Sequence, residues 1–79
     1  MPMDDIPWSK RNLAVLIEEG MLDELTAAVA TDWARGRSIV QTAMGRGISE
    51  RAVSEYRRKI RATYDRVAVY AELPPRRKK

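Results

Sequence analysis

The stretch that decides the fold runs from Gly36 to Ile60 and reads GRSIVQTAMGRGISERAVSEYRRKI. Ala43 is small where two helices would touch, Gly47 follows four residues later where the backbone must turn, and Ile48 supplies an apolar plug. Val53 then begins the inward side of a second helix. Two short helices that cross steeply need a small residue at their contact and a conformationally permissive residue in the turn. The spacing therefore predicts a helix-turn-helix, a motif whose second helix can present its outer face to a groove.

Capping patterns predict the limits of both helices. Ser38 followed by Gln41 forms a capping box, which predicts the start of a short helix that ends near Met44. The turn is expected at residues 45–48. Ser49 then caps the second helix, with an acidic residue in its first turn, where the helix dipole favours negative charge.

Two further helices are expected before this stretch. Ser9 follows an irregular lead-in at residues 1–7 and predicts the start of a helix that ends near Glu19, where Gly20 is a suitable stop. A second helix fits about Leu22 to Arg35. The apolar stripe of the first comprises Leu13, Leu16 and Ile17, and that of the second comprises Leu22, Leu25, Val29 and Trp33. Such periodicity is typical of helices with one buried face.

The C-terminal segment at residues 66–73 is ambiguous. Val67, Val69, Ala71 and Leu73 alternate, which favours a half-exposed strand, whereas Tyr64, Val67 and Ala71 also continue a helical stripe. The alternation slightly favours a short strand, which would need a pairing partner such as a second subunit. Residues 74–79 are interpreted as a basic tail, in which Pro74-Pro75 closes the ordered part and residues 76–79 are expected to be disordered.

The size and composition of the chain point to one small domain. Its 79 residues contain no phenylalanine and no cysteine, so the core must be small and no disulfide can reinforce it. Oligomerisation is the remaining common way to stabilise a domain with so small a core. No apolar run approaches the roughly 18 residues of a membrane span, and the first residues lack the order of a secretory signal. The sequence therefore predicts a cytoplasmic protein with no membrane partner.

Charge is divided unevenly along the chain. Residues 1–34 carry two basic and seven acidic side chains, a net of −5. Residues 35–66 carry nine basic and three acidic side chains, a net of +6, and residues 67–79 add a net of +3. The basic excess begins where the predicted motif begins, which is the pattern expected for a polyanionic partner.

The usual residues of catalysis are missing. The chain contains no histidine and no cysteine, which removes the commonest general base, nucleophile and metal ligands. Its adjacent acidic pairs diverge by about 100° on a helix, so they do not converge on one metal or substrate. The sequence therefore predicts no enzyme, no cofactor, no metal site and no small-molecule substrate.

With these residues laid out, the chain resembles the small plasmid transcriptional repressors of the TrfB/KorA family over roughly residues 8–73. The resemblance rests on Ala34-Arg35-Gly36-Arg37, on Ala43, Gly47 and Ala52-Val53-Ser54, and on the run from Tyr64-Asp65-Arg66-Val67 into Leu73-Pro74. Arg46 stands where such motifs usually carry a leucine. The resemblance implies a homodimeric repressor that binds palindromic operators.

The motif assigns roles to the residues around it. The inward set is expected to be Ala52, Val53, Tyr56 and Ile60. The predicted base-reading residues are Ser49, Glu50, Arg51, Ser54 and Glu55, because the start of the second helix enters the major groove. The predicted phosphate contacts are Ser38, Gln41, Thr42, Arg46 and Arg58. The predicted dimerisation residues are Tyr64, Val67, Val69, Ala71 and Leu73.

These predictions combine into a domain plan and a function. Residues 8–65 would form the helix-turn-helix domain and residues 66–73 a dimerisation segment. The predicted function is a sequence-specific repressor that binds double-stranded DNA as a homodimer on a palindromic operator of a plasmid or phage. Two alternatives stay open, namely a DNA-binding module of a packaging or recombination complex, and a small phage-type protein-interaction factor.

Overall fold

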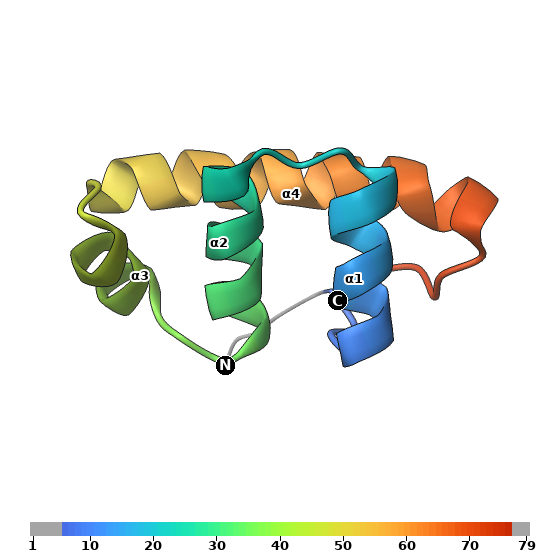
Figure 1. Ribbon diagram of the computed structural model, residues 1–79, viewed down its shortest axis with the longest axis horizontal. Coiled ribbons are helices and arrows are strands. Elements are labelled where there is room, and N and C mark those ends of the chain that lie inside the picture. The colour runs from blue at the N-terminus through green and yellow to red at the C-terminus, as the bar shows by residue number, and fades with distance from the viewer. Residues whose placement is uncertain (1–5, 77–79) are drawn as a thin grey trace.

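Four helices make up the part of the chain that the computed structural model describes, residues 6–76. They are α1 (Lys10–Glu19), α2 (Glu24–Ala34), α3 (Ile39–Arg46) and α4 (Glu50–Ala71). In Figure 1, α1 and α2 lie antiparallel beside each other and run across the long α4, while α3 packs near the start of α4. The predicted mainly α-helical fold is confirmed. No helix in residues 6–76 combines the length and apolar character needed to cross a membrane.

Side-chain caps begin each helix. The hydroxyl of Ser9 accepts a hydrogen bond from the backbone N–H of Asn12 at 3.0 Å, which confirms the predicted start of α1. The prediction for the second helix was two residues too early, because Asp23 is its N-cap and accepts from the N–H of Thr26 at 2.8 Å. Each cap supplies an acceptor to a backbone donor that has no partner within its helix.

One apolar core joins all four helices. Its buried members are Ile6, Leu16, Val29, Ala30, Trp33, Ala43, Val53, Ile60, Tyr64, Val67 and Leu73. Ile6 and Leu73 belong to this core, so it extends beyond both ends of the predicted domain at residues 8–65. The long α4 contributes four of these side chains and packs against each of the other helices. It is therefore the element on which the rest of the fold is built.

Gly20 allows the end of α1 to approach α4 closely. A Cβ at this position would lie 2.5 Å from the carbonyl oxygen of Leu16 and 2.6 Å from Cγ2 of Thr63 in α4. The backbone at Gly20 has a φ of −79°, so it is the lack of space that requires glycine there. The hydroxyl of Tyr70 donates to the carbonyl of Glu19 at 3.1 Å and ties the same corner to the last turn of α4.

The preference for a C-terminal strand at residues 66–73 was wrong, because α4 continues to Ala71 and residues 6–76 contain no strand. Tyr64 and Val67 are fully buried in the core, whereas Val69 is 82% exposed. Burial therefore follows the three- and four-residue spacing of a helix and not the two-residue alternation of a strand. The alternation of small apolar residues is a local pattern, and burial of one helical face against α1 overrides it.

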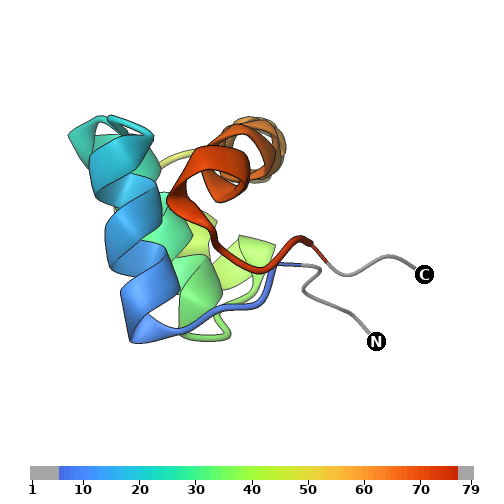
Figure 2. The same ribbon diagram turned by 90° about the vertical axis from the view of Figure 1, so that its right-hand side faces the viewer.

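After α4 the chain turns back beside the helix, as Figure 2 shows. Glu72 takes a left-handed conformation with a φ of 58°, and the N–H of Leu73 donates to the carbonyl of Ala68 at 3.1 Å. The hydroxyl of Tyr64 donates to the carbonyl of Pro74 at 2.5 Å, and burial raises the pKa of Tyr64, which keeps this donor protonated. Residues 77–79 of the predicted disordered tail lie outside the described residues.

Candidate nucleic-acid interface

The turn between α3 and α4 consists of Gly47, Ile48 and Ser49. Gly47 caps α3 in the left-handed region at φ 69° and ψ 35°, where residues with a Cβ are disfavoured. The N–H of Ile48 donates to the carbonyl of Ala43 at 3.0 Å, and its side chain packs on the core. Ala43 is 5% exposed. The predicted turn was placed slightly too early, because α3 continues to Arg46 instead of ending near Met44.

The capping box predicted for α3 is confirmed. The hydroxyl of Ser38 accepts from the N–H of Gln41 at 3.0 Å, and the side-chain oxygen of Gln41 accepts from the N–H of Ser38 at 2.9 Å. Both residues are exposed, whereas Thr42 is buried and 1% exposed. Thr42 was therefore wrongly predicted as a surface phosphate contact. Its hydroxyl has no hydrogen-bond partner among the described residues.

The start of α4 presents a polar outer face. Five predicted DNA contacts in its first nine residues are all exposed, namely Glu50, Arg51, Ser54, Glu55 and Arg58. The predicted inward set lies on the opposite side, where Val53 and Ile60 are fully buried and Ala52 and Tyr56 are half-buried. A helix with 3.6 residues per turn separates the two sets cleanly.

The outer face of α4 is little engaged by the rest of the described chain. Arg51 forms no hydrogen bond or ion pair with any residue from 6 to 76. Arg58 lies 3.9 Å from a carboxylate oxygen of Glu55, a distance and exposure at which an ion pair adds little stability. Ser49 is exposed and uses its hydroxyl oxygen to cap Ala52 at 3.0 Å. The cationic head of Arg51 is thus available to an external anion.

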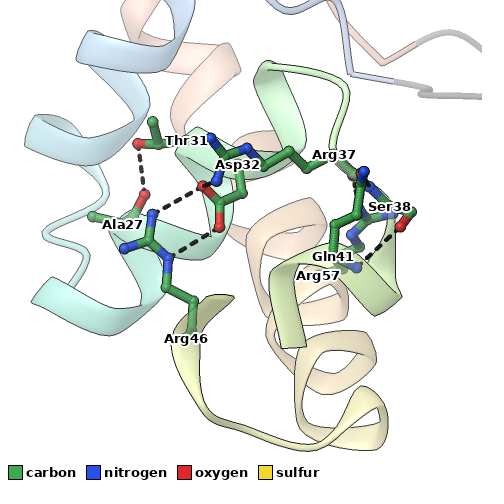
Figure 3. A network of polar contacts seen from close by, with 8 residues as sticks. All are labelled: Ala27, Thr31, Asp32, Arg37, Ser38, Gln41, Arg46 and Arg57. Atoms are coloured by element: carbon green, nitrogen blue, oxygen red, sulfur yellow. Dashed lines mark hydrogen bonds and ion pairs between the residues drawn. The ribbon is translucent and has the colours of Figure 1, made fainter. Parts of the chain in front are cut away.

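Arg46 points toward the protein rather than outward. Its Nε donates to Asp32 at 3.0 Å and its Nη2 donates to the other carboxylate oxygen at 2.9 Å, a bidentate arrangement drawn in Figure 3. Arg37 lies 3.5 Å from the same carboxylate. This geometry does not support the predicted phosphate role of Arg46, because two of its N–H groups are already bound to Asp32.

Asp32 is fully buried on α2, so its charge is stable only with such partners. The hydrogen bond from Arg46 holds the pKa of Asp32 below its usual value, against the opposite effect of burial. The pair joins α2 to the last turn of α3. The sequence carried one signal of this contact, since Asp32 stands within the apolar stripe of α2 and Arg46 stands where a leucine is usual.

Two more basic residues pack on Trp33 instead of facing outward. The guanidinium carbon of Arg57 lies 4.6 Å from the centre of the Trp33 ring and that of Arg61 lies 5.0 Å from it. Arg57 also donates to the carbonyl of Arg37 at 2.9 Å, and Trp8 meets Trp33 edge-on at 5.4 Å. The stacking fixes α4 against the end of α2, and the hydrogen bond to Arg37 fixes it against the segment that connects α2 to α3.

The nine basic side chains of residues 35–66 therefore divide into two groups. Arg37, Arg46, Arg57 and Arg61 contact Asp32, Trp33 or a backbone carbonyl. The second group, all exposed, comprises Arg35, Arg51, Arg58, Lys59 and Arg66, of which Arg58 lies near Glu55 and Lys59 lies over the ring of Tyr56 at 5.8 Å. Arg37 and Arg46 are exposed as well, although they contact Asp32. About half of the charge excess seen in the sequence thus has partners inside the fold. On α4 the four exposed basic residues exceed the three exposed acidic residues, Glu50, Glu55 and Asp65, by one charge.

Three of the five predicted dimerisation residues lie inside the protein itself. Tyr64 and Val67 are fully buried and Leu73 is 6% exposed, so these three were wrongly placed on an intersubunit surface. Ala71 is half-buried and Val69 is 82% exposed. Of the predicted set, only Val69 offers a large apolar side chain to a partner.

The exposed face of α4 and the turn before it are the features that a nucleic acid could engage.

Within residues 6–76, no group of histidine, cysteine, aspartate or glutamate side chains is arranged to hold a metal ion. Comparisons with family models, with curated proteins and with solved structures find no match to this chain.

Proposed function

We propose that the protein is a sequence-specific DNA-binding transcriptional repressor of a plasmid or phage. It would act in the cytoplasm as a homodimer on a palindromic operator. In this proposal α3, the turn at residues 47–49 and α4 form a helix-turn-helix whose reading helix is the start of α4. The role is binding rather than catalysis, since the chain has no histidine or cysteine. The resemblance to the TrfB/KorA repressors is the basis for proposing a repressor of a plasmid or phage.

One observation carries the proposal. The polar side chains on the outer face of the first nine residues of α4 are exposed, whereas the opposite side of the same helix packs on the core. Five residues with potential donors or acceptors are exposed there, and Arg51 has no partner among the described residues. Arginine makes the commonest specific major-groove contact, with two hydrogen bonds to guanine. Glu50 and Glu55 accept hydrogen bonds and suit a cytosine amino group. A mixed acidic and basic face favours base reading over phosphate attraction alone.

The phosphate contacts proposed from the sequence need revision. Ser38, Gln41 and Arg58 remain exposed, whereas Thr42 is buried and Arg46 is bound to Asp32. Arg35 and Lys59 are exposed basic residues that can take their place. Gln41 keeps its side-chain amide donors, because the capping box uses only its oxygen.

The proposed dimer uses the end of α4 and the corner between α1 and α2. Exposed apolar side chains gather in these elements: Val69 is 82% exposed, Tyr70 55% and Met21 87%. The hydrogen bond from Tyr70 to Glu19 joins the two elements. A two-fold pair would set two reading helices about 34 Å apart, one turn of the duplex, and so require a palindromic site.

Selection of bound fragments from a random duplex library, followed by sequencing, tests the proposal. We expect one short palindrome. Arg51→Ala should then weaken binding to that site by about 1–3 kcal/mol and relax the preference at one base pair. Arg66→Ala is the matched control, because it removes the same charge from an exposed position later in α4. It should weaken binding without changing any base preference.

Three results would contradict parts of this proposal. Equal weakening on all duplexes by Arg51→Ala would reassign Arg51 to phosphate contact. Ring assembly with weak sequence preference would favour a packaging or recombination module. Failure to bind any duplex, together with specific capture of a host protein by the acidic N-terminal half, would favour a protein-interaction factor.

A further inference from the structure

An open groove lies between α1 and the end of α2. Its volume is about 510 Å³, which is within the range of small-molecule sites. Its apolar lining includes Trp8, Leu13, Ile17 and Ala34, all of which are only half-buried. An apolar ligand that covers these side chains would remove hydrophobic surface from water. The proposed DNA contacts and the proposed dimer surface do not use this apolar lining.

Three hydrogen-bond donors gather at one end of the groove. Because α1 and α2 are antiparallel, the start of α1 and the end of α2 lie together, at the lower end of the pair in Figure 1. Lys10 is the first residue of α1 and Arg35 is the C-cap of α2, and both line the groove. Their exposed side chains form no hydrogen bond or ion pair with any residue from 6 to 76. Ser9 also lines the groove, and its hydroxyl oxygen caps Asn12 while its O–H can still donate.

The apolar lining extends from this charged end along α1. Lys10, Leu13 and Ile17 follow one another at steps of three and four residues, so they lie on the same side of the helix. Seven residues separate Lys10 from Ile17, or about 10 Å along the helix axis at about 1.5 Å per residue. The groove therefore fits a molecule that carries one negative group on an apolar body of similar length. A carboxylate can accept hydrogen bonds from both cations, and the body then packs along α1.

The groove shares one side chain with the proposed DNA-binding surface. Arg35 lines the groove, and it is also one of the exposed basic residues proposed above to contact phosphate. A carboxylate in the groove and a phosphate of the duplex would compete for the same guanidinium group. Two ligands that compete in this way weaken each other's binding by the same factor.

We propose that this groove binds a small carboxylate with an apolar body, and that the bound ligand weakens DNA binding by occupying Arg35. The ligand class comprises medium-chain fatty acids and arylalkanoates. Binding of the carboxylate depends on the groove alone, whereas its effect on DNA rests on the proposed DNA-binding function. The ligand is bound and released unchanged, so no catalytic step is involved.

Nuclear magnetic resonance titration of the isotopically labelled full chain tests the site. The probes are octanoate and phenylbutyrate, and the controls are octanol, which lacks the charge, and acetate, which lacks the apolar body. Both probes should shift the backbone amide signals of Trp8, Leu13 and Ala34 and leave those of Val69 and Tyr70 unchanged. The tighter probe identifies an alkyl or an aryl body. Octanol should bind about threefold or more weakly than octanoate, the scale of exposed ion pairs.

Two neighbouring cations on α1 provide a matched pair of variants. Lys10→Gln and Arg11→Gln each remove one positive charge from the first turn of α1, but only Lys10 lines the groove. Lys10→Gln should weaken octanoate binding about threefold, and Arg11→Gln should change it far less. Ala14→Glu places a carboxylate in the groove from an exposed helical position and should weaken binding further. Circular dichroism verifies that each variant folds.

Fluorescence anisotropy of the selected duplex measures the competition with DNA. Saturating octanoate should lower the affinity of the full chain about two- to fivefold, whereas octanol and an equal concentration of acetate should not. The slope of log affinity against log salt should become shallower by about 0.9, because one phosphate contact is lost. Lys10→Gln should bind the duplex nearly as the wild type does, but should need more octanoate for the same loss. Octanoate should also raise the melting temperature, because it binds the folded chain.

The outcomes separate the site from its effect on DNA. Equal binding of octanoate and octanol, or shifts at Val69 and Tyr70 instead of the groove, overturns the site. Shifts at Trp8 and Leu13 on dilution of the protein alone would show that a second copy occupies the groove, and would overturn the ligand assignment.

The competition has its own refuting results. Octanoate that binds in the groove and leaves the affinity for the selected duplex unchanged overturns the competition alone. A melting temperature that octanoate lowers would attribute the loss of DNA binding to unfolding and would also overturn it. A full chain that selects no duplex overturns the proposed function and the competition together, while the octanoate titration still decides whether the site exists.

Discussion

The ion pair between Asp32 and Arg46 gives a stringent test of how α3 is held against α2. Arg46→Met removes both hydrogen bonds to a fully buried carboxylate and leaves it only Arg37 at 3.5 Å. Loss of one partner from a buried pair costs about 3–5 kcal/mol. The side chain of Arg46 is 35% exposed and Arg37 remains, so we expect a smaller loss of about 2–3 kcal/mol. In a domain of this size that loss lowers the melting temperature by roughly 10–20 °C.

A double-mutant cycle measures the interaction energy between Asp32 and Arg46 separately from the effect of each single substitution. Asp32→Leu removes the buried charge and keeps the same branched arrangement of heavy atoms, and the double variant with Arg46→Met leaves no uncompensated charge. We expect the double variant to be less destabilised than the sum of the single variants, by about 1.5–3 kcal/mol. Urea unfolding followed by circular dichroism measures each free energy of unfolding. Arg51→Met on the outer face of α4 is the matched control and should leave stability nearly unchanged.

Low pH should remove the stabilisation that the Asp32–Arg46 pair provides. Because Arg46 holds the pKa of Asp32 below its ordinary value of 3.8, this carboxylate stabilises the folded state above that value and loses its effect as the pH falls through the lower folded pKa. The difference in melting temperature between the wild type and Arg46→Met should therefore shrink below about pH 4. Additive single-variant losses, or a difference that does not depend on pH, would refute the assignment of Asp32 and Arg46 as a coupled pair.

Two other changes test the contact between α3 and α4 and the proposed dimer. Ala43→Leu should destabilise the fold by about 1–3 kcal/mol, because Ala43 is 5% exposed and a larger side chain overpacks its site; unchanged melting and unchanged DNA binding would show that the contact is wrongly assigned. Val69→Asp should produce monomers and weaken operator binding while helicity is kept, because Val69 is 82% exposed. Light scattering measures this effect, and a wild-type monomer or a dimer indifferent to the change would disprove the interface.

The sequence by itself determined the features that depend on near neighbours. The caps at Ser9, Ser38 and Ser49 were predicted because a cap and its acceptor or donor lie within three residues. The outer face at the start of α4 was predicted because helical periodicity places apolar and polar residues on opposite sides. The left-handed turn at Gly47 followed from the same local reasoning.

Only the tertiary structure decided where distant groups meet. Residues 66–71 read almost equally well as strand or helix, and the packing of Tyr64 and Val67 into the core made them helical. Charge totals could not distinguish Arg46, which binds Asp32, from Arg51, which faces outward. The physical reason is common to both cases. A local pattern limits which sides of an element are polar or apolar, but the partner of a buried side chain lies many residues away and is set by how the helices pack.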